Sequence, residues 1–304
     1  MGRDPVSTMP GGRDPAGAWT AGQADTAQTD DSKPSGISVR ELERDLPEAP
    51  GATAGASPLP SLALIGRGRL GGAIARAAAA ARIDLTRGGR EDALKACRSA
   101  EAALLCVPDA AIPDACATIA DAVPPLRLVG HSSGATSLDA LSAAAERGAE
   151  TFSLHPLQTV PDDATDLTGA PCAVAGSTQA TERFASELAA ALGMRPFAVP
   201  EERRAAYHAA ASIASNFLVA LEESAAGLLK EAGVDDPREL LAPLVLRTAA
   251  NWSERGGEAL TGPIARGDQA TVTAHLEALR ESASELVPLY EALAERTRAL
   301  AEER

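Results

Sequence analysis

Hydrophobic and polar positions divide the chain into three parts. From residue 58 to about 198, short apolar runs alternate with Ala-rich stretches of helical periodicity, and from 199 to 304 only helical periodicity continues. Residues 1–57 show neither pattern and are rich in Gly, Pro, Ala, Ser, Thr and Asp. We therefore expect a disordered tail at 1–57, an α/β domain at 58–198 and an all-helical domain at 199–304. A solitary short helix at 39–46 would lie within the tail, unless translation starts at Met9 or later.

The apolar runs of the second part do not alternate with polar residues, which is typical of strands buried in a parallel sheet. Strands are expected at 61–65, 82–86, 102–107, 127–130, 150–154 and 171–175. Helices are expected between and after them at 72–81, 91–99, 112–122, 137–146 and 179–192. Strands that alternate with helices predict a doubly wound parallel sheet of the Rossmann type, with right-handed crossovers.

The third part reads as three long helical stretches. They cover 201–232, 237–255 and 269 to the C-terminus, with Pro288 as a kink or break in the last. Asp236 before Pro237 has the residue types of an N-cap and a first helical position, and Asp268 is expected to cap the last stretch.

The first expected strand stops at a glycine turn, Gly66-Arg67-Gly68-Arg69-Leu70-Gly71. In a strand–turn–helix context, Gly66 allows the tight bend, Gly68 lets the backbone approach a pyrophosphate and Gly71 lets the helix pack closely. The N-terminus of the following helix adds free N–H groups and a partial positive charge. The turn therefore predicts a dinucleotide site, with Arg69 and Leu70 in contact with the cofactor.

The residues after the second expected strand favour NADP over NAD. A site for NAD usually carries an acidic residue at this position, which binds the ribose hydroxyls. The chain has Arg87 and Arg90 there, and Arg67 or Arg69 could help them to bind a 2′-phosphate. The nearby Asp84 falls inside the strand. The alternative is that these arginines are ordinary solvated side chains.

Polar residues follow three further strands, at the edge of the sheet where ligands of such folds bind. They are Val107-Pro108-Asp109, His131-Ser132-Ser133-Gly134 and His155-Pro156-Leu157-Gln158. We expect Val107, Pro108, Asp109 and Ser133 to contact the cofactor. His131 either braces its loop or takes part in catalysis, whereas His155 lies near the domain junction and is the better candidate to meet a substrate.

The first long helix of the third part has a polar face. His208, Ser212, Ser215 and Asn216 fall within about a quarter-turn, opposite a face of Ile213, Phe217 and Leu221 that we expect to pack. Short polar groups in an Ala-rich helix suit a cleft, so His208 and Asn216 are candidate catalytic residues. The alternative is an ordinary solvated stripe.

Charge and composition limit the classes of binding partner that we expect. The net charge is −14 and the pI is about 4.8, so general binding to nucleic acid or to a membrane surface is not expected. Aromatic residues make up 3% of the chain, too few for base-stacking platforms. The four cysteines form no metal-binding spacing and are expected to be buried thiols of a cytoplasmic protein. No apolar run is long enough to span a bilayer, and no metal site is expected.

Taken together, the glycine turn, Val107-Pro108-Asp109, His131 to Gly134, His155 to Thr159, Tyr207-His208 with Ser215-Asn216, and Leu260 to Asp268 resemble one family. It comprises Rossmann-like proteins whose helical half is called domain of unknown function 2520, and the resemblance runs from about residue 62 to 300. The family is similar to the six-phosphogluconate-dehydrogenase-like reductases, which include ketopantoate and pyrroline-5-carboxylate reductases. The resemblance implies an NADP-binding homodimer joined through its helical domain.

The resemblance also implies an NADP(H)-dependent oxidoreductase that acts on a small carboxylate-bearing carbonyl or imine metabolite. Related reductases place a lysine and then an asparagine in the first long helix, but here His208 and Asn216 stand nearby without a lysine. We therefore expect His208 as proton donor, Asn216 as substrate orienter, and His155 as a second contact or the alternative donor. Two alternatives are a prephenate-dehydrogenase-like enzyme, suggested by His155-Pro156, and a protein that binds NADP(H) without turnover.

Overall fold

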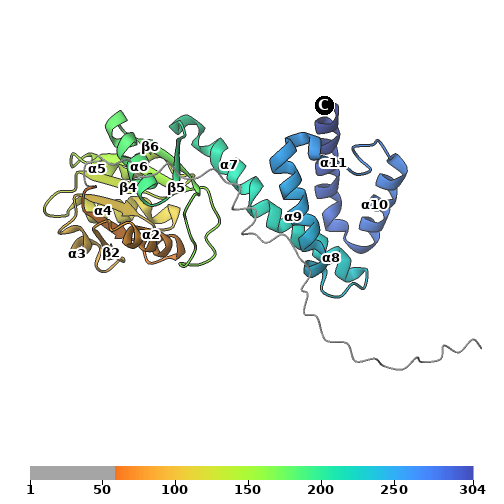
Figure 1. Cartoon of the computed structure of the whole chain (residues 1–304), viewed down its shortest axis with the longest axis horizontal. Coiled ribbons are helices and arrows are strands. Elements are labelled where there is room, and N and C mark those ends of the chain that lie inside the picture. The colour runs from red at the N-terminus through yellow and green to blue at the C-terminus, as the bar shows by residue number, and fades with distance from the viewer. Residues whose placement is uncertain (1–58, 304) are drawn as a thin grey trace, which may run out of the picture. The chain divides into compact units, whose positions relative to one another are not determined.

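The computed structural model describes residues 59–303, so the expected tail at 1–57, with its short helix at 39–46, lies outside the described residues. A seven-stranded sheet forms the centre of the first described part (Figure 1). Its strands are β1 (Leu62–Ile65), β2 (Leu85–Gly88), β3 (Ala102–Leu105), β4 (Leu128–His131), β5 (Glu150–Pro156), β6 (Pro171–Gly176) and β7 (Arg195–Ala198).

The strand order β2-β1-β3-β4-β5-β6-β7 is that of a doubly wound sheet. Strands β1 to β5 run parallel, with Ile65 level with Gly88 and Leu105, and His131 level with Ser153. β6 runs antiparallel to β5, and β7 runs parallel to β6. The chain switches direction across the sheet between β1 and β3, so the carboxyl ends of these two strands flank the crevice in which such sheets bind ligands.

Helices cover both faces of the sheet because successive strand residues point to opposite sides. Leu62 and Leu64 of β1 pack with α2 (Arg69–Ala80) and α6 (Gln179–Ala191) in one core. Ala63 and Ile65 pack on the other face with α3 (Ala93–Cys97), α4 (Ile112–Ala120) and α5 (Ser142–Ala145). Both cores are built mainly from Ala, Leu, Ile and Val, which explains why so few aromatic residues are needed.

The Rossmann-type sheet is confirmed, but some predicted boundaries are wrong. The second strand begins three residues later than expected, because the turn after α2 lies at residues 81–82, where Arg82 has a positive φ of 57°, and strand pairing starts at Leu85. β7 was not expected, since its residues Arg195–Ala198 include a proline and no apolar run. Edge strands tolerate such sequences because one side of the strand needs no partner.

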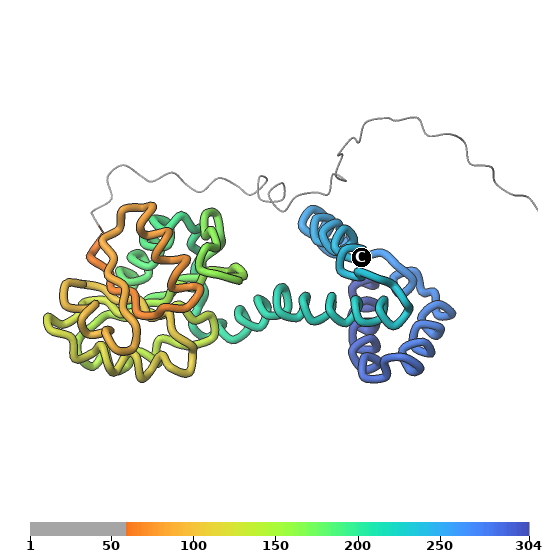
Figure 2. The backbone as a smooth tube through the Cα atoms, turned by 90° about the horizontal axis from the view of Figure 1, so that it is seen from below, coloured from red at the N-terminus to blue at the C-terminus, as the bar shows by residue number. Residues whose placement is uncertain are grey.

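The described elements after β7 are all helical. They are a 3-10 turn at Glu201–Arg203, α7 (Arg204–Ala214), α8 (Asn216–Glu231), α9 (Pro237–Arg255), α10 (Gln269–Ser282) and α11 (Val287–Glu302), with further 3-10 turns at Gly256–Ala259 and Ser284–Leu286. The chain leaves the sheet through α7 and continues into α8 (Figure 2). None of the described helices is long and apolar enough to cross a membrane.

Two details of the helical part differ from expectation, and two others agree with it. The stretch 201–232 is two helices, because Ser215 leaves helical geometry with φ −124° and ψ −70°. Asp236 precedes α9 in the left-handed region, and its side chain makes no capping hydrogen bond. The expected break near Pro288 is confirmed: α10 ends at Ser282, and Pro288 lies in the first turn of α11, where a proline costs no hydrogen bond. The expected Asp268 cap is confirmed, since its carboxylate accepts a 3.1 Å hydrogen bond from the Thr271 backbone N–H.

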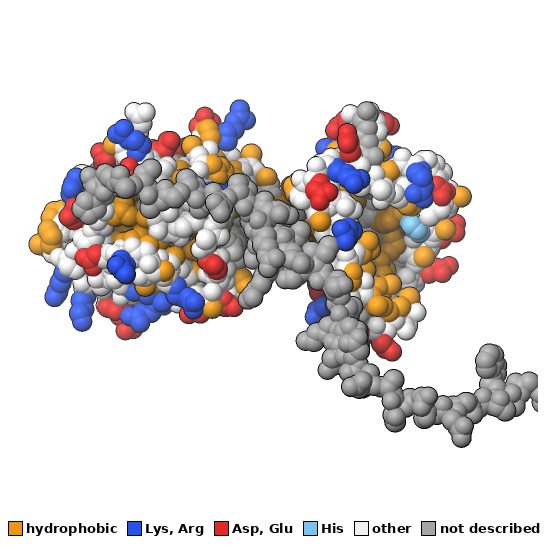
Figure 3. All heavy atoms as spheres, viewed as in Figure 1, with side chains coloured by type: hydrophobic (Ala, Val, Ile, Leu, Met, Phe, Trp, Pro, Cys, Tyr) orange, Lys and Arg blue, Asp and Glu red, His pale blue; other side chains and the backbone are white. Residues whose placement is uncertain are grey.

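The helical part buries few of its own side chains. Hydrophobic side chains are visible on its surface in Figure 3, and six large ones are more than half exposed. These six, called here the apolar surface, are Ile213, Phe217, Val219, Leu240, Leu244 and Trp252. The face of Ile213 and Phe217 that was expected to pack is therefore not covered by the described residues.

Candidate functional site

A pocket of about 500 Å³ lies at the carboxyl ends of β1 and β3. Residues of the glycine turn, of the turn after β2 and of the segment after β3 line it. The lining includes Gly66, Arg67, Gly68, Gly89, Arg90, Cys106, Val107 and Pro108. The pocket therefore lies at the switch point of the sheet, beside the N-terminus of α2, which has no acidic residue in its first turn.

The three glycines of the turn have different physical reasons to be glycine. A Cβ on Gly66, whose φ is +143°, would overlap the carbonyl of Cys106, and a Cβ on Gly71 would lie 2.7 Å from the Gly66 oxygen. A Cβ on Gly68 would meet no protein atom within 4 Å. Packing of the chain thus requires Gly66 and Gly71, whereas Gly68 keeps open the space that a ligand's phosphates would need.

Three of the four arginines expected around the 2′-phosphate have partners within the chain, and the fourth, Arg90, lines the pocket. Nη2 of Arg67 lies 2.8 Å from Oδ2 of Asp92, and the other carboxylate oxygen, Oδ1, accepts a hydrogen bond from the backbone N–H of Gly89. These contacts hold the pKa of Asp92 below its usual value, with the Gly89 bond as the largest cause. The Arg67–Asp92 ion pair is exposed, and it connects the glycine turn with the segment that follows β2.

Arg87 and Arg69 are turned to backbone carbonyls. Nε and Nη2 of Arg87 donate to the carbonyls of Gly66 and Gly68 at 3.1 and 3.4 Å, so Arg87 braces the glycine turn. Arg69 donates to the carbonyl of Pro161 at 3.5 Å. Arg90 lines the pocket directly. Arg67 and Arg90 are therefore the cationic side chains of the pocket lining.

The remaining expected cofactor contacts are divided between the pocket and its surroundings. Val107 and Pro108 line the pocket, whereas Asp109 begins the exposed 3-10 turn that follows them. Leu70 is half-buried against the core beneath α2. Cys106 also lines the pocket, and its burial raises the pKa of its thiol to about 12, so it is a neutral thiol.

The loop after β4 is tied down by its own side chains. Nδ1 of the buried His131 accepts a 3.2 Å hydrogen bond from the N–H of Ser133, so His131 braces this loop, and its Nε2 has no hydrogen-bond partner among the described residues. Oγ of Ser133 donates to Thr136 at 2.8 Å and accepts from two backbone N–H groups. Burial, aided by the charge of Arg204, lowers the pKa of His131 to about 4.

Two of the three candidate catalytic residues come together at this loop. Nε2 of His155 and Nδ1 of His208 each lie 2.8 Å from the position that a Cβ on Gly134 would take. The two rings have centroids 6.0 Å apart. Nδ1 of His155 lies 2.7 Å from the hydroxyl of Tyr207. Burial is the largest cause that lowers the pKa of His155 to about 4, followed by His208 and Arg204.

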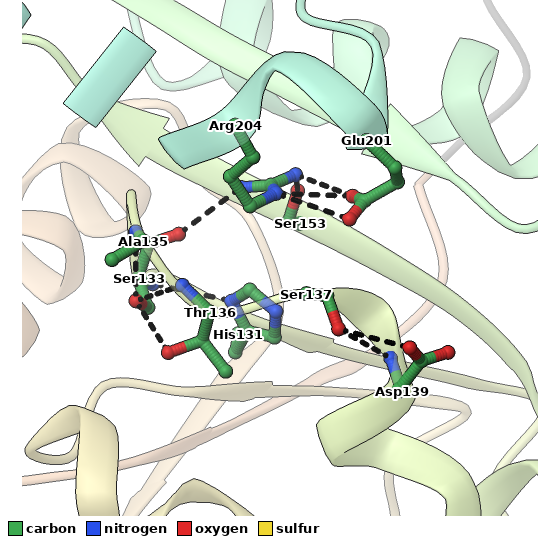
Figure 4. A network of polar contacts seen from close by, with 9 residues as sticks. All are labelled: His131, Ser133, Ala135, Thr136, Ser137, Asp139, Ser153, Glu201 and Arg204. Atoms are coloured by element: carbon green, nitrogen blue, oxygen red, sulfur yellow. Dashed lines mark hydrogen bonds and ion pairs between the residues drawn. The ribbon is translucent and has the colours of Figure 1, made fainter. Parts of the chain in front are cut away.

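A buried arginine, Arg204, fixes α7 to the sheet (Figure 4). Nη2 of Arg204 donates to Oγ of Ser153 on β5 at 2.6 Å, and Nη1 donates to the carbonyl of Ser133 at 3.3 Å. Its third partner is Glu201, with an Nη2–Oε1 distance of 2.7 Å. Because Arg204 is 3% exposed and fully paired, it organises the site and is not available to a substrate.

Asn216 does not join the two histidines. It is exposed at the start of α8, and its Oδ1 accepts a 3.1 Å hydrogen bond from the hydroxyl of Ser215. The helix break at Ser215 separates Asn216 from the face of α7 that carries His208. The expected continuous polar face of 208–216 is therefore interrupted.

Arg204 and Tyr207 were not among the expected site residues. Arg204 belongs to the run Glu201-Glu202-Arg203-Arg204, which has the composition of a solvated helix start, and Tyr207 is one of only two tyrosines. The available signal was the spacing of three residues between Arg204 and Tyr207, which places the two side chains on one helix face about one turn apart.

Solved structures of other proteins share the fold of this chain. The fold resembles a protein of Bacteroides fragilis provisionally assigned as an NADP oxidoreductase, with a TM-score of 0.65, 21% identity, and 80% of this chain and 99% of that chain covered. It also resembles pyrroline carboxylate reductase of Plasmodium falciparum, which was solved with NADP bound. The TM-score is 0.55, the identity is 15%, and the match covers 81% of this chain and 100% of the reductase chain. A third similar structure is a reductive aminase of Aspergillus terreus, solved with NADPH and ethyl levulinate. The TM-score is 0.56, the identity is 20%, and the match covers 78% of this chain and 93% of the aminase chain.

The doubly wound sheet, the glycine turn at its switch point and the helices after β7 define a Rossmann-type protein with the fold of NADP-dependent oxidoreductases. Residues 72–156 match the Rossmann-like domain, and residues 170–297 match the Domain of unknown function (DUF2520). The chain thus matches both domain models that the sequence resemblance implied. No curated protein matches the sequence.

Proposed function

We propose that this chain is an NADP(H)-dependent oxidoreductase that acts on a small carboxylate-bearing carbonyl or imine metabolite. The observation that carries the proposal is the pocket of about 500 Å³ over the glycine turn, at the switch point of the sheet. Ligands of doubly wound sheets bind at this place. Relatives of the same fold include a pyrroline carboxylate reductase and a reductive aminase, both solved with the phosphorylated nicotinamide cofactor.

The chain's own residues fit NADP(H). Open space at Gly68 and the N-terminus of α2 suit a pyrophosphate, and Arg67 and Arg90 supply cationic groups in the pocket lining. The guanidinium group pairs well with a 2′-phosphate. When bound, the cofactor supplies the hydride chemistry, and the protein's task is to place the substrate and to handle protons.

In this proposal His208 donates the proton that the substrate's oxygen or nitrogen needs as charge develops on it. His155 provides a second polar contact from β5, and Asn216 orients the substrate. Convergence of His155 and His208 at Gly134 supports the pairing of the two histidines. Asn216 is exposed at the start of α8, beyond the break at Ser215.

The first experiment measures cofactor binding and turnover separately. Thermal stabilisation of the full chain by NADPH and by NADH reports binding, and stabilisation grows with ligand concentration over Kd. NADPH consumption is then followed with 2-oxo acids and cyclic imines, and NADP⁺ reduction with hydroxy acids and prephenate. We expect NADPH to stabilise more than NADH and at least one substrate class to be turned over. Binding without turnover in either direction would favour an NADP(H)-responsive binding protein, and binding of neither nucleotide would refute the proposal.

A second experiment tests the proton donor. His208→Gln keeps a polar side chain of related length but cannot donate a proton at neutral pH, so turnover should fall at least a hundredfold. The affinity for NADPH should stay nearly intact because the pocket lining does not include His208. Full activity in this variant would remove His208 from the mechanism. His275→Gln changes an exposed histidine on α10 and serves as the control.

We also propose that two copies of the chain form a homodimer through the helical part. The apolar surface supports this, because large exposed apolar patches on soluble proteins mark interaction sites. Sedimentation at micromolar concentration should give twice the monomer mass, and Phe217→Lys should give monomers. A monomeric unaltered chain would contradict the dimer.

A further inference from the structure

The chain contains two tyrosines, and each hydroxyl lies at hydrogen-bond distance from Nδ1 of a histidine. Tyr207 on α7 lies 2.7 Å from Nδ1 of His155, and Tyr290 on α11 lies 2.8 Å from Nδ1 of His275. The first pair is at the candidate site, between the sheet and α7. The second pair is on the surface of the helical part and has no connection with the candidate site.

The direction of the Tyr207–His155 hydrogen bond follows from the number of protons that the two groups carry. A tyrosine hydroxyl has one proton, which needs an acceptor when the group is buried. Among the described residues, Nδ1 of His155 is the acceptor that this hydroxyl reaches. If His155 were the donor instead, the half-buried hydroxyl of Tyr207 would lose its acceptor. The favoured arrangement is therefore Tyr207 O–H donating to a deprotonated Nδ1.

The surroundings of His155 favour the neutral ring. Burial is the main cause that lowers its pKa to about 4, and His208, Arg204 and His131 act in the same direction, against Asp109. Burial raises the pKa of Tyr207 to about 12, so the phenol keeps its proton near neutral pH. A neutral imidazole has one N–H, and the hydrogen bond at one nitrogen decides which nitrogen carries it.

We propose that Tyr207 is a positioning residue that fixes His155 as the neutral tautomer with its proton on Nε2. Nε2 makes no hydrogen bond to the described residues, so its N–H remains available to a molecule outside the chain. If the proposed function holds, on which this consequence rests, His155 meets an acceptor atom of the substrate: a carbonyl or carboxylate oxygen, or an imine nitrogen with a free lone pair. A neutral donor of this kind orients the substrate, and the transferred proton comes from His208.

The tautomer can be measured without any turnover. Nitrogen NMR of the full chain with ¹⁵N-labelled histidine distinguishes a protonated from an unprotonated ring nitrogen, and the four histidines are assigned by single His→Gln variants. At pH 7 we expect His155 to carry its proton on Nε2. In Tyr207→Phe, which removes only the hydroxyl, the preference should shift towards Nδ1–H or a mixture of tautomers.

Tyr290→Phe is the matched control, because it removes the hydroxyl from the second Tyr–His pair. It should change the His275 signals and leave those of His155 as they were. The thermal midpoint of both variants shows whether each is folded. A His155 proton on Nδ1 in the unaltered chain, an imidazolium at pH 7, or an unchanged tautomer in folded Tyr207→Phe would each overturn the proposal.

Activity separates this inference from the proposed function. If the tautomer is as expected but no substrate is turned over, only the proposed function fails. If turnover is found, Tyr207→Phe should lower kcat/KM for the substrate about tenfold and leave the NADPH affinity unchanged. Turnover with the opposite tautomer would refute the role of Tyr207 alone.

Discussion

Nη2 of Arg204 donates a 2.6 Å hydrogen bond to Oγ of Ser153, and this contact ties the first turn of α7 to β5. The same guanidinium reaches the loop after β4 through the carbonyl of Ser133. One buried cation therefore joins a strand, a loop and a helix that together carry His131, His155 and His208.

Replacement of Arg204 by Met should lower the free energy of unfolding by about 2–3 kcal/mol. The loss arises because buried hydrogen-bond acceptors on Ser133 and Ser153 would remain without a donor. Urea denaturation of the full chain measures it. Arg203→Met is the control, since Arg203 is the exposed neighbour and its loss should cost less than about 0.5 kcal/mol. Equal stability of the two variants would show that the Arg204 network does not hold α7.

Replacement of Gly68 by alanine should weaken NADPH binding, whereas replacement of Gly66 by alanine should lower the stability of the fold. Gly68→Ala places a methyl group in open space beside the pocket, so stability should change by less than about 1 kcal/mol while NADPH affinity falls about tenfold or more. Gly66→Ala forces a positive φ on alanine and an overlap with Cys106, which should cost about 2 kcal/mol or more. Thermal midpoints with and without NADPH distinguish the two. Unchanged NADPH affinity in Gly68→Ala would place the phosphates elsewhere.

Stability should fall when the pH is lowered from about 6.5 to about 4. His131 and His155 have folded pKa values of about 4, below the unfolded value of 6.5, because burial favours the neutral ring. The unfolded chain then binds more protons in this range, so stability is fully present above pH 6.5 and is lost as the pH falls. Each histidine contributes a slope of up to about 1.4 kcal/mol per pH unit. Urea denaturation of His131→Asn at pH 7, 6 and 5 should show a shallower slope, and an unchanged slope would assign the acid sensitivity to other groups.

Gly134→Ala should reduce turnover and preserve cofactor binding. The new Cβ would lie 2.8 Å from Nε2 of His155 and from Nδ1 of His208, so one ring must move. Activity should fall about tenfold or more, since displacement of catalytic groups by about 1 Å is costly. Gly227→Ala on α8 has open space around it and is the control. Normal turnover in Gly134→Ala would mean that the two histidines are not used together.

The sheet and the glycine turn were predictable because local sequence determines them. Leu62 to Ile65 is a continuous apolar run, and Gly66 and Gly71 stand where a close backbone contact leaves no room for a Cβ. Periodicity and turn chemistry report such features directly. β7 was missed because its pairing with β6, and not its composition, makes it a strand.

The site was less predictable because its geometry depends on contacts distant in sequence. His155 was singled out correctly as a polar residue near the end of a strand, but its partner Tyr207 lies 52 residues away. Arg204 has the composition of a solvated residue, and its burial becomes evident only once Ser133 and Ser153 are placed beside it. The break at Ser215, which leaves Asn216 at the start of a separate helix, was not predicted because it has no clear signal in an Ala-rich sequence.

The spacing between Arg204 and Tyr207 has a consequence for the rotational phase of α7. Three residues along an α-helix turn the chain by about 300°, so both side chains project from nearly the same side, one towards Ser153 and the other towards His155. A single residue inserted between them would rotate Tyr207 by about 100° away from His155 while Arg204 kept its anchor. In α7, the number of residues between Arg204 and Tyr207 therefore determines the geometry of the site together with the identity of these two residues.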